Sequence, residues 1–583
     1  MVKNKIAKSI QAGLLASGLL TAVSSHGVEF FMDVEGSFTS QLSIGSSWRV
    51  SDQDERLLAP GNNNDGNANF EKGDAFSQIF KGSHDLHLRS GNHGVFVRGK
   101  YWHDFALEEG EFDHGHSANG FTSEEKLNDK EFNELSKFSG AALLDAYVYG
   151  MYEIGYTPID VRLGRQVVSW GESTFILGGV NSINPVDVNA FRRPGAEIKE
   201  GLLPVNMAYV NIGLTEFLSM EAFYQLEFQE TVIPGCGTYF AFNDYAPEGC
   251  NQVILTSDAL AGLGDAQRSA GGYVIIRDAN GNRLAKDEGQ YGIAFRYMSE
   301  ALGDTEFGFY AMNIHSRLPV VNGIKSATWG AAASPSDADQ LTAINNNKDG
   351  TFYYVTYPED IQLAGLSFST NVGSMAVSGE ISHKKDVPLQ INATMLLGAG
   401  LTGLSTSTKL MADVAATANG ADFEGYRLFD VSQAQFTMLQ FFDRFLGASR
   451  YTLIAEAGYT FIHDFDESDD AIKFSRAGVF DGEEGGFVTE RSWGYRARLV
   501  GEYNNAFAGV NLKPTLAFSH DVEGFAPQPG GAFKEGEQSV GFTLQADYAS
   551  MYSASVSYTE YMGGDYSLTS DRDFVSVSMS VQF

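Results

Sequence analysis

The chain has 583 residues, 43% of them hydrophobic and 13% aromatic, and its formal net charge is −33. So large an acidic excess repels nucleic-acid phosphate and excludes DNA or RNA as a partner. After the first 26 residues, no stretch is apolar over enough length to form a transmembrane helix.

The first residues have the pattern of a secretory signal. Lys3, Lys5 and Lys8 precede the apolar run "IQAGLLASGLLTAV", which small residues follow. This order of basic, apolar and small residues predicts a signal peptide over 1–26 and an exported chain over 27–583. A retained anchor is the alternative, but the run is short for a bilayer and no stop-transfer segment follows.

Segments of alternating apolar and polar residues recur from there to the last residue. "HGVFVRGKYWHDF" sets Val95 and Val97 against Arg98 and Lys100, and the final "DFVSVSMSVQF" alternates to Phe583. About ten alternating residues per segment is typical of outer-membrane barrel strands, whose apolar side chains face lipid. The last strand would pair with the first, which explains why the alternation runs to the terminal residue.

The connections between these segments are alternately short and long. Short ones such as "SGNH", "NVGS" and "YASM" carry hairpin-turn residues, and nine longer polar links lie between them. This asymmetry predicts an all-β, transmembrane antiparallel β-barrel of about 18 strands (16–20), with short periplasmic turns and long extracellular loops. A secreted sandwich would need a second apolar face, and a solenoid would need a fixed repeat; neither is seen.

The polar face of the strands would line the interior of the barrel. Rings of charged side chains in a pore set its solute preference, although they can also neutralise one another and keep the interior wet. The basic residues on this face that we expect to contact a solute are Arg98, Lys100, Arg162, Arg496 and Arg498.

The third long link, residues 172–201, differs from the others. Its sequence "GESTFILGGVNSINPVDVNAFRRPGAEIKEG" is apolar and contains two prolines and the pair Arg192 and Arg193. Such a loop is poorly suited to open water, so we expect it to fold into the barrel as a constriction. The two arginines would then bind an anionic group of the solute. Packing at the rim is the alternative.

Cys236 and Cys250 lie in one predicted loop, "CGTYFAFNDYAPEGC". In an exported protein they are expected to form a disulfide rather than remain as two thiols.

Two loops are rich in possible metal ligands. "GNNNDGNANFEKGD" lacks a full calcium-loop pattern, and His103, His114 and His116 lie near carboxylates. Polar solvated loops explain both better, so no metal or cofactor is predicted. The chain also lacks the G-x-S-x-G and H-E-x-x-H motifs, and we predict no catalytic residue and no enzyme activity.

Several segments resemble one family of Gram-negative outer-membrane β-barrels catalogued as a domain of unknown function. They include "RLGRQVVSWGESTFILGGVNSINPVDV", "FRRPGAEIKEGLLPVNM" and "EAFYQLEFQ". The resemblance implies location in the cell outer membrane, in contact with its lipid and lipopolysaccharide. It also implies frequent gene proximity to an LolB-like periplasmic lipoprotein and an RND-type exporter.

These observations together predict a non-enzymatic outer-membrane channel or transporter. Its solutes would be hydrophobic or amphipathic, lipid- or steroid-like, including anionic ones. Two alternatives remain: an embedded lipid-modifying enzyme with Ser and His from separate strands, and a plugged barrel that serves as a docking or structural partner of the periplasmic lipoprotein and exporter.

Overall fold

The computed structural model describes residues 34–256, 260–326, 351–402, 407–468 and 470–583. The predicted signal peptide, residues 1–26, therefore lies outside the described residues.

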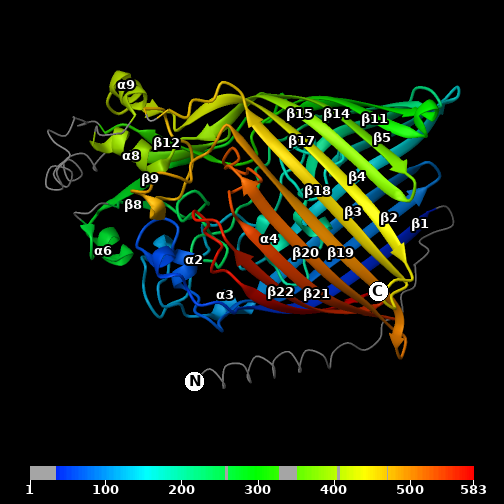
Figure 1. The fold of residues 1–583 in the computed structure, drawn as a ribbon, viewed down its shortest axis with the longest axis horizontal. Coiled ribbons are helices and arrows are strands. Elements are labelled where there is room, and N and C mark those ends of the chain that lie inside the picture. The colour runs from blue at the N-terminus through cyan, green and yellow to red at the C-terminus, as the bar shows by residue number, and fades with distance from the viewer. Residues whose placement is uncertain (1–33, 257–259, 327–350, 403–406, 469) are drawn as a thin grey trace.

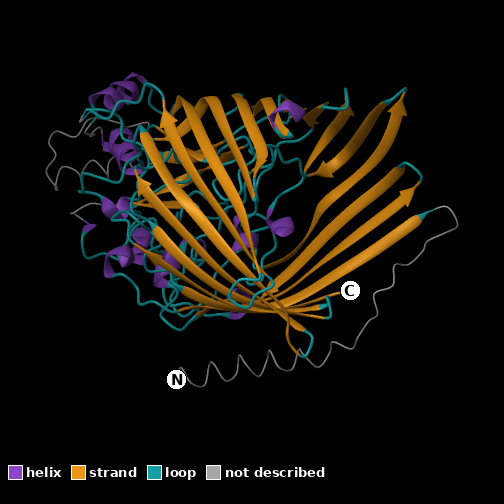
Figure 2. Ribbon diagram, turned by 45° about the vertical axis from the view of Figure 1, so that its right-hand side comes forward, coloured by secondary structure: helices purple, strands orange, loops and turns teal. Residues whose placement is uncertain are grey.

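Eighteen antiparallel strands form one closed barrel (Figures 1 and 2). Each strand pairs with its neighbours in chain order, and β1 pairs with β23 to close the ring, with Leu42 opposite Val581. The predicted strand number and closure are confirmed. The strands are β1 (Glu35–Arg49), β2 (Ala75–Ser90), β3 (His93–Asp104), β4 (Ser139–Ile154), β5 (Thr157–Gln166), β6 (Val205–Gly213), β7 (Leu218–Gln225), β10 (Tyr291–Ser299), β11 (Thr305–Ile314), β14 (Ile361–Val372), β15 (Met375–Gln390), β17 (Tyr426–Asp443), β18 (Arg450–Ile462), β19 (Arg491–Phe507), β20 (Val510–Glu523), β21 (Gln538–Tyr548), β22 (Tyr552–Met562) and β23 (Phe574–Gln582).

The alternation of the sequence separates the two faces of this sheet. In β15, Ile381 is 52% exposed on the outer face, while its neighbours Glu380 and Ser382 are 6% and 2% exposed on the inner face. Large apolar side chains repeat this outward exposure around the barrel, among them Leu143, Leu163, Phe309, Leu366, Phe436, Leu516, Phe542, Val556 and Met579. A closed barrel with an apolar outer belt satisfies its backbone within lipid, and this chain spans the outer membrane in that way.

The two ends of the barrel differ, as predicted. Eight tight turns join strand pairs at the periplasmic end, such as Gly91–Asn92 between β2 and β3 and Gly373–Ser374 between β14 and β15. The nine long connections, the last of them leading into β23, are at the extracellular end (Figure 1).

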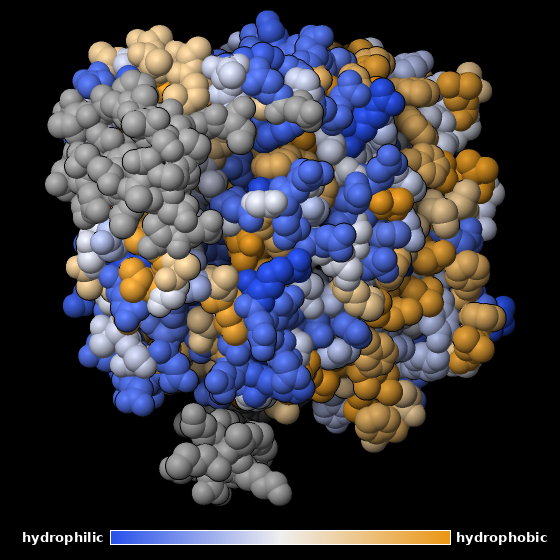
Figure 3. All heavy atoms as spheres, turned by 60° about the vertical axis from the view of Figure 1, so that its left-hand side comes forward, coloured by the Kyte–Doolittle hydropathy of each residue, from blue (hydrophilic) through white to orange (hydrophobic). Residues whose placement is uncertain are grey.

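The long loops are not simple polar links. Together they build a cap, seen with the helices at the loop end of the barrel in Figure 2 and largely hydrophilic on its outer face in Figure 3. A second sheet, with the order β16-β12-β13-β9-β8, lies within the cap. Its strands are β8 (Gln252–Ile254), β9 (Val274–Arg283), β12 (Val320–Ile324), β13 (Phe352–Thr356) and β16 (Asp422–Phe423). This second sheet was not predicted from the sequence, because the strands are short and pair across distant loops.

The described helices are short. In the part of the chain that the structure describes, no helix has the length and apolar character needed to cross a membrane. They are η2 (Glu55–Leu58), α2 (Asp65–Ala68), α3 (Phe105–Glu109), η3 (Ser117–Asn119), α4 (Val188–Arg192), α5 (Ile198–Gly201), α6 (Asp265–Ala270), η5 (Glu300–Leu302), α8 (Ala393–Leu397), η6 (Gly398–Thr402), α9 (Thr408–Ala416) and η7 (Gly478–Phe480).

Candidate functional site

Residues 167–204, which join β5 to β6, form the inserted segment. Its backbone and side chains are hydrogen-bonded to inward-facing side chains of strands on different sides of the barrel. The segment has a first arm, residues 170–184, and a second arm, residues 187–201, which contains α4 and α5.

Two buried carboxylates hold the first arm. Glu456 of β18 accepts backbone N–H groups from Thr174, Phe175 and Ile176, at 2.8, 2.6 and 2.8 Å. Glu380 of β15 accepts the N–H groups of Glu172 and Val180, at 2.6 and 2.9 Å. A carboxylate that accepts several backbone N–H groups forms strong, charge-assisted bonds, so these two residues fix the path of the arm.

Glycine is required where this arm meets Glu380. A Cβ atom at Gly179 would lie within 1.9 Å of Glu380 Oε1, and Gly171 has a φ of +87° in the left-handed region. The "GES" and "LGGV" sequences therefore permit an approach that larger residues would block.

The first arm also closes an apolar core inside the barrel. Trp170, Val180 and Ile183 are at most 1% exposed, and they pack with inward-facing apolar side chains such as Phe223 and Met312. Trp170 Nε1 donates to Glu221 Oε2 at 2.8 Å, which satisfies its buried polar atom. One side of the interior, along β6, β7, β10, β11 and β14, is thereby filled.

The second arm is held at the opposite wall by two lysines. Lys100 of β3 donates to Asp187 Oδ2 at 2.8 Å and to the carbonyl oxygen of Glu200 at 2.9 Å. Lys81 of β2 donates to the Glu200 carboxylate and to the carbonyl oxygen of Gly195, both at 2.7 Å. Lys100, predicted to contact a solute, therefore anchors the inserted segment.

The wall formed by β20, β21 and β22 differs from the covered walls. Most of its inward-facing residues are small and polar, and they are half-buried rather than buried: Thr515, Ser519, Ser539, Thr543, Gln545, Ser553, Ser555, Ser557 and Thr559. The same face also carries Lys513 and Asp547, which form an ion pair at 2.9 Å. Ser519 and Ser539 are hydrogen-bonded to each other, at 2.6 Å, and not to the inserted segment. Their exposure indicates that the interior is open along this wall.

Large apolar side chains of the inserted segment remain exposed inside the barrel. Leu177 on the first arm is 66% exposed, and Phe191 and Ile198 on the second arm are 41% and 72% exposed. Exposed apolar surface within a water-accessible interior points to binding of apolar groups.

The remaining predicted basic residues have different surroundings. Arg98 pairs with Asp85, through bonds of 2.8 and 2.9 Å, and with Asp145 at 3.2 Å. Arg162 stacks on the Tyr209 ring, 5.1 Å from its centroid. The two arginines of β19 have different environments. Arg496 pairs with Asp521 at 2.6 Å, whereas Arg498 is exposed on the inner face.

Arg192 and Arg193 lie at the extracellular end of the second arm. Arg192 stacks on Phe240 of the cap at 4.3 Å, and Arg193 stacks on Trp102 of β3 at 4.4 Å. Both line a small cavity of about 70 Å³ beside Asn189, whose buried Nδ2 has no hydrogen-bond partner. The structure therefore brings the predicted arginine pair to a cavity.

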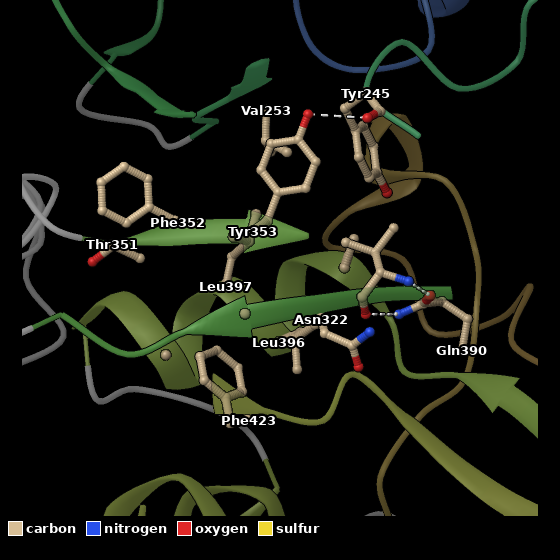
Figure 4. A pocket seen from close by; sticks show the side chains of 14 residues that line it. Tyr245, Val253, Asn322, Thr351, Phe352, Tyr353, Gln390, Leu396, Leu397 and Phe423 are labelled. Atoms are coloured by element: carbon tan, nitrogen blue, oxygen red, sulfur yellow. Dashed lines mark hydrogen bonds between the residues drawn. The ribbon is translucent and has the colours of Figure 1, made fainter. Parts of the chain in front are cut away.

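The predicted disulfide between Cys236 and Cys250 is confirmed, and it lies in the aromatic core of the cap with Phe132 and Tyr239. A second cap cavity, lined by Tyr353, Leu397 and Phe423, is shown in Figure 4. At about 30 Å³ it is far smaller than the several hundred Å³ of a ligand pocket, so it is a packing feature of the cap.

Two residues that anchor the inserted segment were not predicted from the sequence. Gln433 and Gln435 of β17 donate to the carbonyl oxygens of Leu177 and Ile176, at 2.8 and 3.2 Å. Their inward position follows from the alternation of β17, but their partners are about 250 residues away in the chain and carry no local signal.

Comparison with known proteins gave one family and several remote structures. A family model described as "Protein of unknown function (DUF1302)" matches residues 8–583. A search of curated proteins found no match.

Three solved structures are similar over nearly the full length of each chain. OccAB1 of Acinetobacter baumannii is 9% identical, with 97% of this chain and 99% of that chain covered and a TM-score of 0.39. OccK2 (OpdF) of Pseudomonas aeruginosa in complex with glucuronate is 10% identical, with 95% and 99% covered and a TM-score of 0.37. The outer membrane protein OpdK of P. aeruginosa is 9% identical, with 94% and 98% covered and a TM-score of 0.35.

Proposed function

Given that the chain belongs to the family of proteins of unknown function DUF1302, we propose that it is an outer-membrane channel for amphipathic anions. The observation that carries this proposal is the exposure of Leu177 and Ile198 on two arms of the inserted segment inside the barrel. The solute has an apolar body and an anionic group, as lipid- or steroid-like acids do.

The passage runs along the polar wall of β20–β22, between that wall and the inserted segment. The Ser and Thr side chains of this wall bind water or solute hydroxyl groups, whereas the two arms narrow the opposite side. The inserted segment, residues 167–204, is thus the constriction of the channel. Loops folded into a barrel interior commonly restrict wide barrels in this way.

Arg498 provides the charge selectivity. In the register of β18 and β19, Glu456 lies opposite Arg496, and Arg498 is the next inward-facing residue toward the periplasm. Because Glu456 also holds residues 174–176, Arg498 lies next to the anchor of the first arm, on its periplasmic side. An exposed guanidinium beside apolar side chains suits a carboxylate attached to an apolar body.

Transport into liposomes tests this function. We expect Leu177→Gln with Ile198→Gln to reduce uptake of a fluorescent fatty acid while uptake of glucose is unchanged. Arg498→Ala should reduce uptake of the fatty acid but not of its methyl ester, because only the acid is anionic.

Leu446→Gln is the matched control. Leu446 is 71% exposed in the short turn between β17 and β18, so the same chemical change there leaves the interior intact. Equal fatty-acid uptake by the wild type, the double variant and the control would refute the proposed solute class. A protein that admits no solute and is silent in planar bilayers would instead support the plugged docking barrel.

A second candidate function, ester hydrolysis at the membrane surface, rests on Ser432. Its Oγ lies 2.9 Å from His463 Nε2 and 3.0 Å from His383 Nδ1, and Asp430 lies 4.0 Å from the other nitrogen of His383. A serine within hydrogen-bond distance of a histidine, with a carboxylate near that histidine, is similar to the arrangement of a hydrolytic nucleophile. Turnover of phospholipid or ester substrates that Ser432→Ala abolishes would support this function over transport.

The periplasmic lipoprotein and the RND-type exporter stay predictions. Transport of an apolar solute through the barrel requires a periplasmic protein that accepts or delivers it, because such a solute crosses water slowly. Co-purification with the detergent-solubilised barrel would test that requirement.

A further inference from the structure

Two cap segments that the sequence analysis treated as solvated polar loops meet at a buried acidic cluster. Asn64 and Asp65 come from the β1–β2 loop, and they are 3% and 1% exposed. Asp244 and Asp265 come from the β7–β10 connection, at 4% and 2%, and His114 reaches them from the β3–β4 loop. The expectation of a solvated loop at 61–74 holds for residues 71–73, which are exposed, but residues 64–67, 69 and 70 are buried in the cap.

The donor atoms are spaced as metal ligands are. His114 Nε2 lies 3.1 Å from Asp65 Oδ1 and 3.6 Å from Asp265 Oδ2. One donor atom from each of the three residues lies within 4.8 Å of the other two. Two ligands of a tetrahedral ion with bond lengths of about 2.0–2.2 Å are separated by roughly 3.3–3.6 Å.

Several oxygen atoms of the cluster have no partner. Asn64 Oδ1, Asp65 Oδ2, Asp244 Oδ1 and Asp265 Oδ1 are all buried without a hydrogen bond. Buried polar atoms in proteins nearly always have a partner, and a missing ion is one established reason for an exception. Four such acceptors in one place indicate a cation rather than a packing defect.

Nearby positive charge balances these carboxylates only in part, through the attraction between Arg268 and Asp265. The guanidinium of Arg268 in α6 donates its hydrogen bonds to the carbonyl oxygens of Pro60, Leu255 and Leu260, and not to the carboxylates. A bound divalent cation would stabilise these buried carboxylates in their charged form.

We propose that Asp65, His114 and Asp265 bind a divalent transition-metal ion of the Zn²⁺ class. The imidazole nitrogen favours such an ion over Ca²⁺ or Mg²⁺, which prefer oxygen ligands. Asp244 supports the site by accepting the backbone N–H of Asp65 at 3.2 Å, and its second oxygen is available to the ion or to a water bound to it.

The ion fastens three extracellular loops together at the base of the cap. These loops already approach closely, because a Cβ atom at Gly66 would lie 2.1 Å from the carbonyl oxygen of Thr238. The Cys236–Cys250 disulfide closes the same neighbourhood. The metal therefore serves as a structural staple that keeps the cap above the channel.

Metal analysis of the full-length barrel in detergent tests the proposal. The protein is stripped with a chelator, dialysed against Zn²⁺ or Ca²⁺, and analysed by mass spectrometry and calorimetry. We expect about one Zn²⁺ per chain and no Ca²⁺ at the same concentration. Asp65→Asn with His114→Gln should bring the Zn²⁺ content close to zero, and zinc should protect wild-type residues 105–138 from proteolysis.

His103→Gln is the matched control, because His103 packs edge-to-face against Phe105, with ring centroids 4.4 Å apart, outside the cluster. It should retain about one Zn²⁺ per chain. Heat-modifiability on gels confirms that each variant contains a folded barrel. A wild-type protein without bound Zn²⁺, a double variant with unchanged Zn²⁺ content, or binding of Ca²⁺ in preference to Zn²⁺ would overturn the proposal.

Discussion

Glu456 is only 2% exposed, and its two oxygens accept three backbone N–H groups of the inserted segment. Glu456→Gln should release the first arm, since an amide offers one acceptor and directs two donors at those N–H groups. Each lost charge-assisted bond costs about 1.5–3 kcal/mol, so hydrogen exchange at Thr174–Ile176 should accelerate at least ~10-fold.

Glu502→Gln is the control for this prediction, because Glu502 lies near the periplasmic end of β19, opposite Arg450. Unchanged exchange at residues 174–176 in the Glu456 variant would show that the carboxylate does not hold the arm.

His116 makes the cap sensitive to acid. Burial lowers its pKa to about 4. His116 Nε2 accepts the backbone N–H of Asn128 at 2.8 Å and can do so only while it is unprotonated.

Because the folded state binds fewer protons than the unfolded state, cap stability should fall as the pH drops from about 6.5 to about 4. Amide exchange of residues 105–138 should accelerate by roughly ten- to a hundred-fold over that window, measured against His116→Gln. The comparison with His116→Gln separates the contribution of His116 from those of the other titrating groups of the cap. Identical pH profiles for both proteins would contradict this role.

The alternation of the sequence predicted which side chains face inward, but not what they contact there. Arg98 and Lys100 are inward-facing, as expected, and are consumed by Asp85 and Asp187. Asp85 lies opposite Arg98 in the adjacent strand, so that pair is local. The partner of Lys100 is instead set by the path of a loop 87 residues further on.

In the closing strand β23, two neighbouring residues allow a test of which face of the strand contacts lipid. Met579 is 54% exposed on the lipid face, and its neighbour Ser580 faces the interior. Lysine costs about 2–4 kcal/mol on the lipid face near the bilayer midplane and little in a wet interior. We expect Met579→Lys to reduce folded barrel on gels, while Ser580→Lys assembles normally. Equal assembly of the two variants would contradict the assigned faces.

The barrel strands were predictable because apolar and polar residues alternate along each of them. The short turns were predictable because they contain residues typical of hairpins. The cap sheet was not predictable, because its strands pair with distant parts of the chain. Strand β13 pairs in parallel with β9, about 70 residues away, and β12 pairs with β16, about 100 residues away. The buried Asn64–Asn69 region looked like a solvated loop for the same reason: its partners, Gly115, Gly237 and Asp571, are remote in sequence.

At the scale of the whole molecule, charge and apolar surface are separated. The acidic residues responsible for the net charge of −33 are concentrated in the extracellular loops, whereas the interior presents paired charges, a Ser/Thr wall and the exposed apolar side chains of the inserted segment. An acidic cap would slow the approach of anions at low salt and less so at high salt, because salt screens the repulsion. Residues inside the barrel then select among the solutes that arrive.

If the inserted segment narrows an otherwise open barrel, its removal should widen the channel. Planar-bilayer recordings can compare the wild type with a chain in which residues 171–183 are replaced by a flexible Gly/Ser linker. We expect a small wild-type conductance that a fatty-acid anion blocks, and a large, unblocked conductance in the replaced chain. Equal conductance and equal block in the two proteins would contradict it.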